Sequence, residues 1–145
     1  MTPIDYTPWI DFFRIRLTGG AAPVINPSLF VENGDMHYGN SPMYVEEVIG
    51  IDGEKHLTDI NNPDLQMTVS YNVFANKKMP NGARTSAQLQ VKIGAALMKN
   101  FNPIQNIAIY EISAKRRIST TQEGWRLSPI DITFKLCNIN NQTGD

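Results

Sequence analysis

Two adjoining stretches decide the fold: MTVSYNVFA at residues 67–75 and SAQLQVKIGAALMKNF at residues 86–101. Apolar and polar side chains alternate in the first stretch, which predicts a β-strand with one buried face and one wet face. Its apolar members are Met67, Val69, Tyr71, Val73 and Ala75. In the second stretch the apolar residues recur at helical spacing, at Leu89, Ile93, Ala96, Leu97 and Phe101. We expect an amphipathic helix whose apolar stripe packs on the strand.

A polar loop from Asn76 to Gly82 joins the two stretches and ends in an Asn-Gly turn signal. We expect Thr85 or Ser86 to cap the helix. Lys99 would lie in its last turn, where a cation suits the helix dipole.

A shorter helix is predicted over residues 8–18, because Pro8 suits a first helical position and Gly19-Gly20 ends the pattern. Thr7 could cap it. Its aromatic residues Trp9 and Phe13 have two interpretations. They either dock an amphipathic helix on the core or anchor a neighbouring subunit.

Residues 21–64 are predicted to form an irregular, proline-rich β region with short strands at 28–32 and 43–50. The Asp52-Gly53 pair predicts a hairpin between residues 44–49 and 54–57. Glu46 and Glu47 indicate an edge or solvent-facing strand. The region is either a β-arm that reaches out, which we favour, or a poorly packed surface layer.

Residues 107–113 and 126–137 are expected to form an antiparallel pair, with Pro129 at a strand start or a bulge. The chain is thus expected to be one domain with an α+β fold. A mixed, mainly antiparallel sheet carries one long amphipathic helix on one face, together with a short N-terminal helix and an extended hairpin or loop region. Residues 65–138 form the core and 139–145 a polar tail.

Composition restricts the classes of function. The 145 residues are 41% hydrophobic, and 13 Lys and Arg against 14 Asp and Glu give a net charge of -1. This balance counts against a dedicated nucleic-acid-binding domain. A single cysteine, Cys137, forms no internal disulfide. Neither a signal peptide nor a transmembrane run is found, so we expect a soluble intracellular product without a membrane partner.

No sequence motif points to chemistry. His37 and His56 lack the spacing of a metal pair, and no local signature makes Cys137 a nucleophile. Gly19-Gly20 lacks the remaining residues of a phosphate loop. We expect no enzyme activity, metal or cofactor, and an enzyme with a dispersed active site is the weakest of the hypotheses.

Basic residues form two clusters, one around the loop (Lys77, Lys78, Arg84) and one after a strand (Arg116, Arg117, with Lys115). They are either a solvated rim or contacts to phosphates or to an acidic protein surface. Trp125-Arg126 is a further interface candidate, since both residue types are common in hot spots.

The order of a short helix, an irregular β region, MTVSYNVFA, SAQLQVKIGAALMKNF and a last strand WRLSPIDITFKL (residues 125–136) resembles the tail terminator, or tail completion, proteins of contractile-tailed bacteriophages. The resemblance implies a structural neck protein that forms a ring, typically a hexamer. The ring would end the tail tube and join it to the head connector, next to the sheath protein. DNA would pass through its centre, and the protein would reside in the virion after assembly in the host cytoplasm. The alternative function is a small nucleic-acid-binding or regulatory module that uses the basic loops.

Overall fold

The computed structural model describes residues 3–32, 41–56 and 63–139 of the chain. The predicted α+β class is confirmed. Two helices and six strands follow one another with a short 3-10 turn: α1 (Thr7–Thr18), η1 (Pro27–Leu29), β1 (Phe30–Glu32), β2 (Met43–His56), β3 (Pro63–Asn76), α2 (Gly82–Leu97), β4 (Ile107–Arg116), β5 (Thr120–Gln122) and β6 (Trp125–Asn138).

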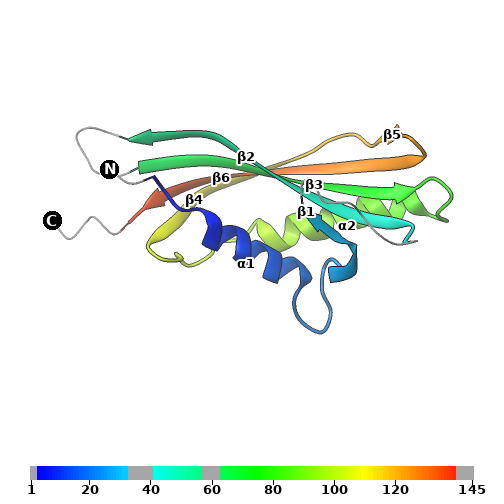
Figure 1. Cartoon of the computed structure of the whole chain (residues 1–145), viewed down its shortest axis with the longest axis horizontal. Helices are drawn as coiled ribbons and strands as arrows, with labels where there is room; N and C mark the ends of the chain where they lie inside the picture. The colour runs from blue at the N-terminus through cyan, green and yellow to red at the C-terminus, as the bar shows by residue number, and fades with distance from the viewer. Residues whose placement is uncertain (1–2, 33–40, 57–62, 140–145) are drawn as a thin grey trace.

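The strands form one sheet in the order β1-β2-β3-β6-β4, and β5 pairs with the start of β6. The β1–β2 pair is parallel and the other pairs are antiparallel. Figure 1 shows the strands running along the long axis of the molecule, with α1 and α2 on the same side of the sheet. The sheet therefore has an inner face under the helices and an outer face that no helix of the described chain covers.

The inner face is built as the alternation of β3 predicts. Met67, Val69, Tyr71, Val73 and Ala75 are all fully buried. Antiparallel pairing sets Ile130, Ile132, Phe134 and Leu136 of β6 beside them. From the helices, Leu89, Ile93 and Leu97 of α2 and Trp9, Phe13 and Leu17 of α1 complete the core.

The ends of α2 differ from the prediction. The helix begins at Gly82, directly after Asn81, whose φ of 57° places it in the left-handed region. Thr85 and Ser86 therefore both lie inside the helix, and neither is its cap. Ser86 is buried in the first turns and donates to the carbonyl of Ala83 at 3.1 Å. The helix ends at Leu97, and the backbone leaves helical geometry at Met98, whose ψ is 67°. Lys99 lies beyond the helix.

The start of α1 also differs in one detail. Its first residue is Thr7, so Thr7 is not the cap, and Tyr6 holds that position without a side-chain hydrogen bond. Asp5 instead accepts hydrogen bonds from the backbone N–H and the hydroxyl of Thr7, at 3.0 and 2.7 Å.

The predicted hairpin at Asp52-Gly53 is wrong. Both residues lie inside β2, where the pairing with β3 shifts by a bulge between Ile51 and Gly53 and then continues to His56. The Asp52 carboxylate accepts a 2.6 Å hydrogen bond from Thr68 of β3, so the bulge is tied to the sheet. Residues 43–56 are thus an integral strand, neither a projecting arm nor a loose layer, and the strand predicted at 28–32 shrinks to β1.

The C-terminal antiparallel pair is confirmed, but Pro129 lies within β6. The carbonyl of Pro129 accepts from the N–H of Arg117, which follows the last residue of β4. A strand residue directs its C=O and N–H positions to the same side. The N–H that Pro129 lacks would therefore point toward residues 117–119, which connect β4 to β5. No strand pairs with β6 there, so the sheet loses no hydrogen bond. Residues 140–145 of the predicted tail, and His37, lie outside the described residues.

Phe134→Ala tests the core assignment. Phe134 is fully buried and stacks on Phe13 with ring centroids 4.5 Å apart, so truncation leaves a cavity between sheet and helix. We expect a loss of about 3–5 kcal/mol in the free energy of unfolding, measured by urea denaturation. Ile118→Ala, at a side chain that is 89% exposed, should change it by less than about 0.5 kcal/mol. An equal effect of both variants would contradict the inner-face assignment.

Candidate interface surfaces

Trp9 and Phe13 are not on the surface. Both are fully buried in the chain's own core. The indole N–H of Trp9 donates to the carbonyl of Ile107 at 3.1 Å, and Phe13 stacks on the sheet through Phe134. The interpretation as subunit anchors is therefore wrong, and the docked amphipathic helix is confirmed. The helix is short, so it buries its largest residues to hold itself on the sheet.

Glu47 was expected to face solvent or an edge, yet it is 1% exposed beneath α1. Arg14 of α1 donates to its Oε1 through Nε at 2.9 Å and through Nη2 at 2.7 Å. The Tyr71 hydroxyl donates to Oε2 at 3.0 Å. A second carboxylate, Glu32 of β1, meets Arg14 at 3.0 Å. Alternation along β2 points Glu46 to the outer face and Glu47 to the inner face.

This cluster, in which the buried Glu47 and Tyr71 meet the half-buried Arg14 and the exposed Glu32, serves structure. Burial raises the pKa of Glu47 although Arg14 opposes the shift, and burial beside Glu47 raises the pKa of Tyr71 well above its ordinary value. Each polar atom of the Glu47 carboxylate is used within the cluster, so it offers no base to a substrate. It ties α1, β1, β2 and β3 together. The sequence does hold one signal for this cluster. Glu47 lies two residues after Val45, so on a strand both side chains point to the same buried face.

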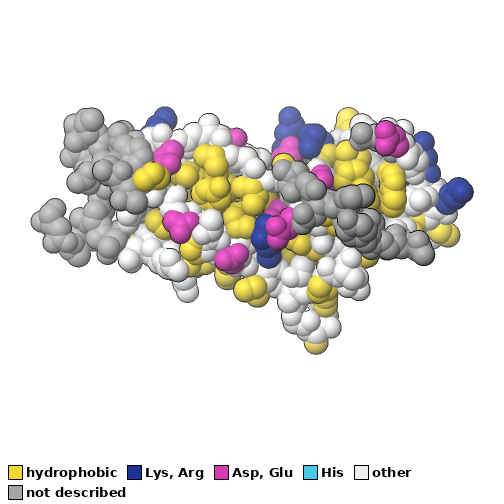
Figure 2. Space-filling model, in the orientation of Figure 1, with side chains coloured by type: hydrophobic (Ala, Val, Ile, Leu, Met, Phe, Trp, Pro, Cys, Tyr) yellow, Lys and Arg dark blue, Asp and Glu magenta, His cyan; other side chains and the backbone are white. Residues whose placement is uncertain are grey.

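The first basic cluster and Trp125-Arg126 meet at one end of the molecule. Trp125 and Arg126 lie opposite Asn76 and Ala75 in the β3–β6 ladder, and the N–H of Lys77 donates to the carbonyl of Gly124 at 3.0 Å. The side chains of Lys77, Lys78 and Arg84 are exposed, and that of Arg126 is half-buried. We call these four cations the basic end. In Figure 2 dark-blue side chains project from this end, on the right of the view.

An aromatic group flanks the basic end on the outer face. Tyr44 stacks on Phe74 with centroids 4.6 Å apart and meets Trp125 edge-on at 5.1 Å. All three rings are half-buried. Sequence analysis predicted only the tryptophan. Phe74 sits at a polar-phase position of β3, and this break in the alternation is the signal that was missed.

The second basic cluster lies apart from the basic end, and its members lie on different faces of the sheet. Arg117 pairs with Asp131 at 3.0 Å on the outer face. Arg116, whose side chain is exposed, lies at the end of β4 on the inner face, in register with Ile130. The two basic clusters therefore do not form one surface.

A groove runs between α2 and the inner face of β4. It consists of two adjoining hollows of about 380 and 420 Å³ that share Met98 as a wall. Arg116, Ala114 and Val91 line the first hollow. The second hollow is mixed: Ile109 and Ile112 line it together with the polar residues Lys99, Asn100, Tyr110 and Glu111. Val91 is 51% and Met98 47% exposed, so the groove offers apolar surface to solvent. It exists because α2 packs over β3 and β6 and stops short of β4.

The edge of β4 away from β6 is open beyond its first residue. In residues 3–32, 41–56 and 63–139, β4 pairs with β6 and, at Ile107 alone, with Ile104 through an isolated bridge. A bulge at Tyr110 interrupts the strand. The Tyr110 hydroxyl donates to Asp64 of β3, and partial burial together with this bond raises the pKa of Tyr110 to about 12. The regular part of the open edge is therefore Ile112–Arg116.

The outer face is polar between its two ends. Thr68 joins Asp52 and Thr133, Ser70 donates to Asp131 at 2.7 Å, and Asn72 donates to Glu46 at 3.2 Å. Acidic and hydroxyl groups thus satisfy one another across the strands.

Neither a metal-ligand cluster nor a membrane-spanning helix occurs in the part of the chain that the structure describes. No three His, Cys, Asp or Glu side chains gather there as metal ligands. No described helix has the length and apolar character needed to cross a bilayer.

Glu47→Ala should strongly destabilise the fold, because it leaves Arg14 and Tyr71 without their acceptor under α1. The expected loss in the free energy of unfolding is about 3–5 kcal/mol by chemical denaturation. Glu46→Ala, one residue away on the outer face, is the matched control and should cost about 1 kcal/mol or less. If the two substitutions cost the same, the cluster does not hold the helix.

No protein-family model matches the chain, and no curated protein matches it. Its function is therefore argued from the surfaces described above.

Proposed function

We propose that the protein is a structural subunit of a ring, of the tail terminator kind found in the neck of contractile-tailed phages. The ring, a hexamer in such proteins, would end the tail tube and join it to the head connector. The observation that carries the proposal is the open β4 edge beside a groove with exposed apolar side chains, Val91 and Met98. Unpaired backbone groups and apolar surface in one place are the properties of a surface that another chain covers.

A closed ring needs two different complementary surfaces on each subunit. The described fold offers unlike sides: β4 with its groove on one and the short β1 with the rest of β2 on the other. The polar, internally bonded outer face and the net charge of -1 suit a channel through which DNA moves, because dense cationic contacts would retain the duplex.

The basic end and its aromatic group are proposed to meet an acidic surface of another neck or tail protein, such as the tube, connector or sheath protein. Lys77 and Lys78 lie on an exposed loop, with Arg84 in the first turn of α2 and Arg126 near the start of β6. Trp125 supplies a large half-buried ring beside them. Such combinations of aromatic and cationic side chains are typical of interface hot spots.

Electron microscopy and analytical ultracentrifugation of the purified full-length chain test the ring. We expect closed particles of one subunit number with a central opening, in equilibrium with monomer at low concentration. A strict monomer at the highest soluble concentration would contradict the proposal.

One observation favours the alternative function, a small nucleic-acid-binding module: Lys77, Lys78, Arg84 and Arg126 converge at one end. Electrophoretic mobility of DNA and RNA with wild type and a Lys77→Glu/Lys78→Glu variant separates the two functions. If the protein is a ring subunit, we expect it not to retard DNA or RNA. Retardation that weakens with salt and is lost in the double variant would favour the nucleic-acid module.

A further inference from the structure

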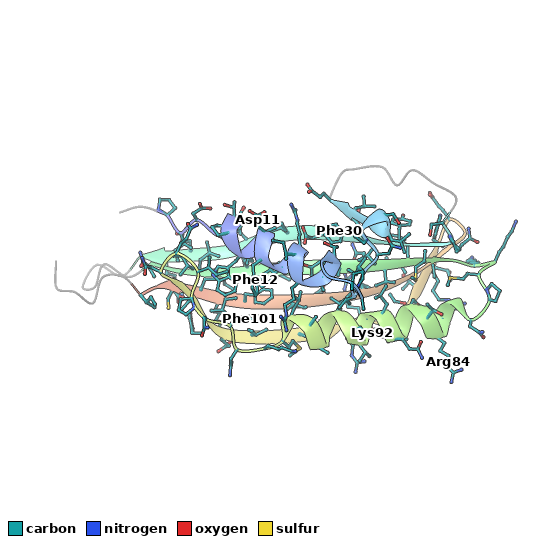
Figure 3. All side chains as sticks on the ribbon, turned by 90° about the horizontal axis from the view of Figure 1, so that it is seen from below. Asp11, Phe12, Phe30, Arg84, Lys92 and Phe101 are labelled. Carbon is teal, nitrogen blue, oxygen red and sulfur yellow. The ribbon has the colours of Figure 1, made fainter. Side chains whose placement is uncertain are left out.

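Charge is distributed unequally across the sheet. β1 and β2 together carry four exposed or half-buried carboxylates (Glu32, Glu46, Asp52, Glu54) and one lysine, Lys55. The fifth carboxylate, Glu47, is buried and paired with Arg14, so it adds nothing to the surface charge. On the other side, α2 and β4 carry four cations (Arg84, Lys92, Lys115, Arg116) and one carboxylate, Glu111. Figure 3 shows Asp11 of α1 and Phe30 of β1 toward one long side of the molecule, and Arg84 and Lys92 toward the other. The acidic side of one copy therefore attracts the basic side of a second copy.

The register of the sheet shows which residues lie at the same height along the strands. Arg116 of β4 pairs with Ile130, Ile130 with Tyr71, Tyr71 with Glu47, and Glu47 with Glu32 of β1. Directly paired residues share a face, so Arg116 and Glu32 both lie on the inner face at one height, at opposite sides of the sheet.

An apolar pair shares a second height. Ile112 of β4 connects in the same way through Phe134 and Met67 to Ile51 of β2. Ile112 is half-buried beside the groove, and Ile51 is 44% exposed. A neighbour placed at equal height would cover both side chains.

Strand direction also fits a head-to-tail contact. Three successive antiparallel pairs separate β2 from β4, so the two strands run in opposite directions within a subunit. In a ring whose axis runs along the strands, β4 of one copy meets β2 of the next in the antiparallel sense. β2 is open there, since β1 covers only Val45–Glu47 among the described residues.

We propose that Ile112–Arg116 of β4 and the adjoining groove of one copy bind the β1–β2 side of a second copy, with Arg116 against Glu32 and Ile112 against Ile51. This inference rests on the proposed ring and names its subunit contact. The copies join edge to edge, and the acidic and basic sides set the order in which they join.

Charge exchange tests the contact. Arg116→Glu and Glu32→Lys should each raise the concentration of half-assembly by about tenfold, measured by mass photometry, because like charges then face each other. The chain with both substitutions restores an opposite pair at every contact and should return to within about threefold of wild type. Lys78→Glu, which makes the same charge change as Arg116→Glu at the basic end, should leave assembly unchanged.

Glu32 also pairs with Arg14, so folding must be followed separately. Thermal unfolding by circular dichroism and Glu32→Gln, which removes the ion pair without reversing charge, distinguish lost folding from lost assembly. Independent effects of the two reversals without rescue would overturn the proposed contact.

Photo-cross-linking reads the contact without assuming a fixed register. Benzoylphenylalanine in place of the exposed Ser113 of β4 should cross-link to β1 or β2 (residues 30–32 or 43–56) of another copy, identified by mass spectrometry. The same group at Lys78 should not reach those residues. Rings with Ser113 cross-links elsewhere would overturn this contact and leave the ring itself standing, whereas a wild-type chain that never assembles would overturn the proposed function as well.

Discussion

The structure depends on the burial of one face of β3 under two helices. Its alternate side chains are fully buried, and each strand beside β3 takes its phase from this face through the register. A slip of one residue would turn the whole apolar set outward, so the pairing is strongly specified. The helices follow from the same constraint, because α1 and α2 can bury their apolar stripes only on this face. The open edge of β4 and the groove beside α2 are the surfaces that this arrangement leaves uncovered.

Among the described residues, one carboxylate is buried inside this layer. Glu47 occupies an inner-face position, and its burial is tolerated because Arg14 and Tyr71 supply donors from two other elements. Removing one partner would leave a charge under the helix, which is far more costly than an exposed ion pair. α1 is thus fixed in position by a directional contact in addition to its aromatic packing. That fixation also sets the place of Glu32 on the acidic side.

The sequence predicts the core better than the surface, for physical reasons. Alternation in β3 and β6 and the apolar stripe of α2 are properties of single segments, and each of these elements is confirmed. Local signals failed where distant strands compete with them. Asp52-Gly53 favours a turn, yet pairing with β3 on both sides keeps it in the strand. Trp9 and Phe13 could be surface anchors as far as the local sequence shows, but packing of α1 on the sheet buries both. Whether Arg116 and Lys77 share a surface depends on the whole register, so only the structure could separate them.

The two tryptophans occupy unlike surroundings, which gives the chain a built-in optical label. Trp9 is enclosed by phenylalanine rings and hydrogen-bonded inside the core, while Trp125 is half-buried beside Tyr44 at the rim of the sheet. Fluorescence emission from Trp9 reports unfolding of the core. Emission from Trp125 reports a change in solvent exposure at the rim of the sheet. Replacing either one with phenylalanine would leave a single tryptophan, so that one variant reports loss of the native core and the other reports a change at the rim of the sheet.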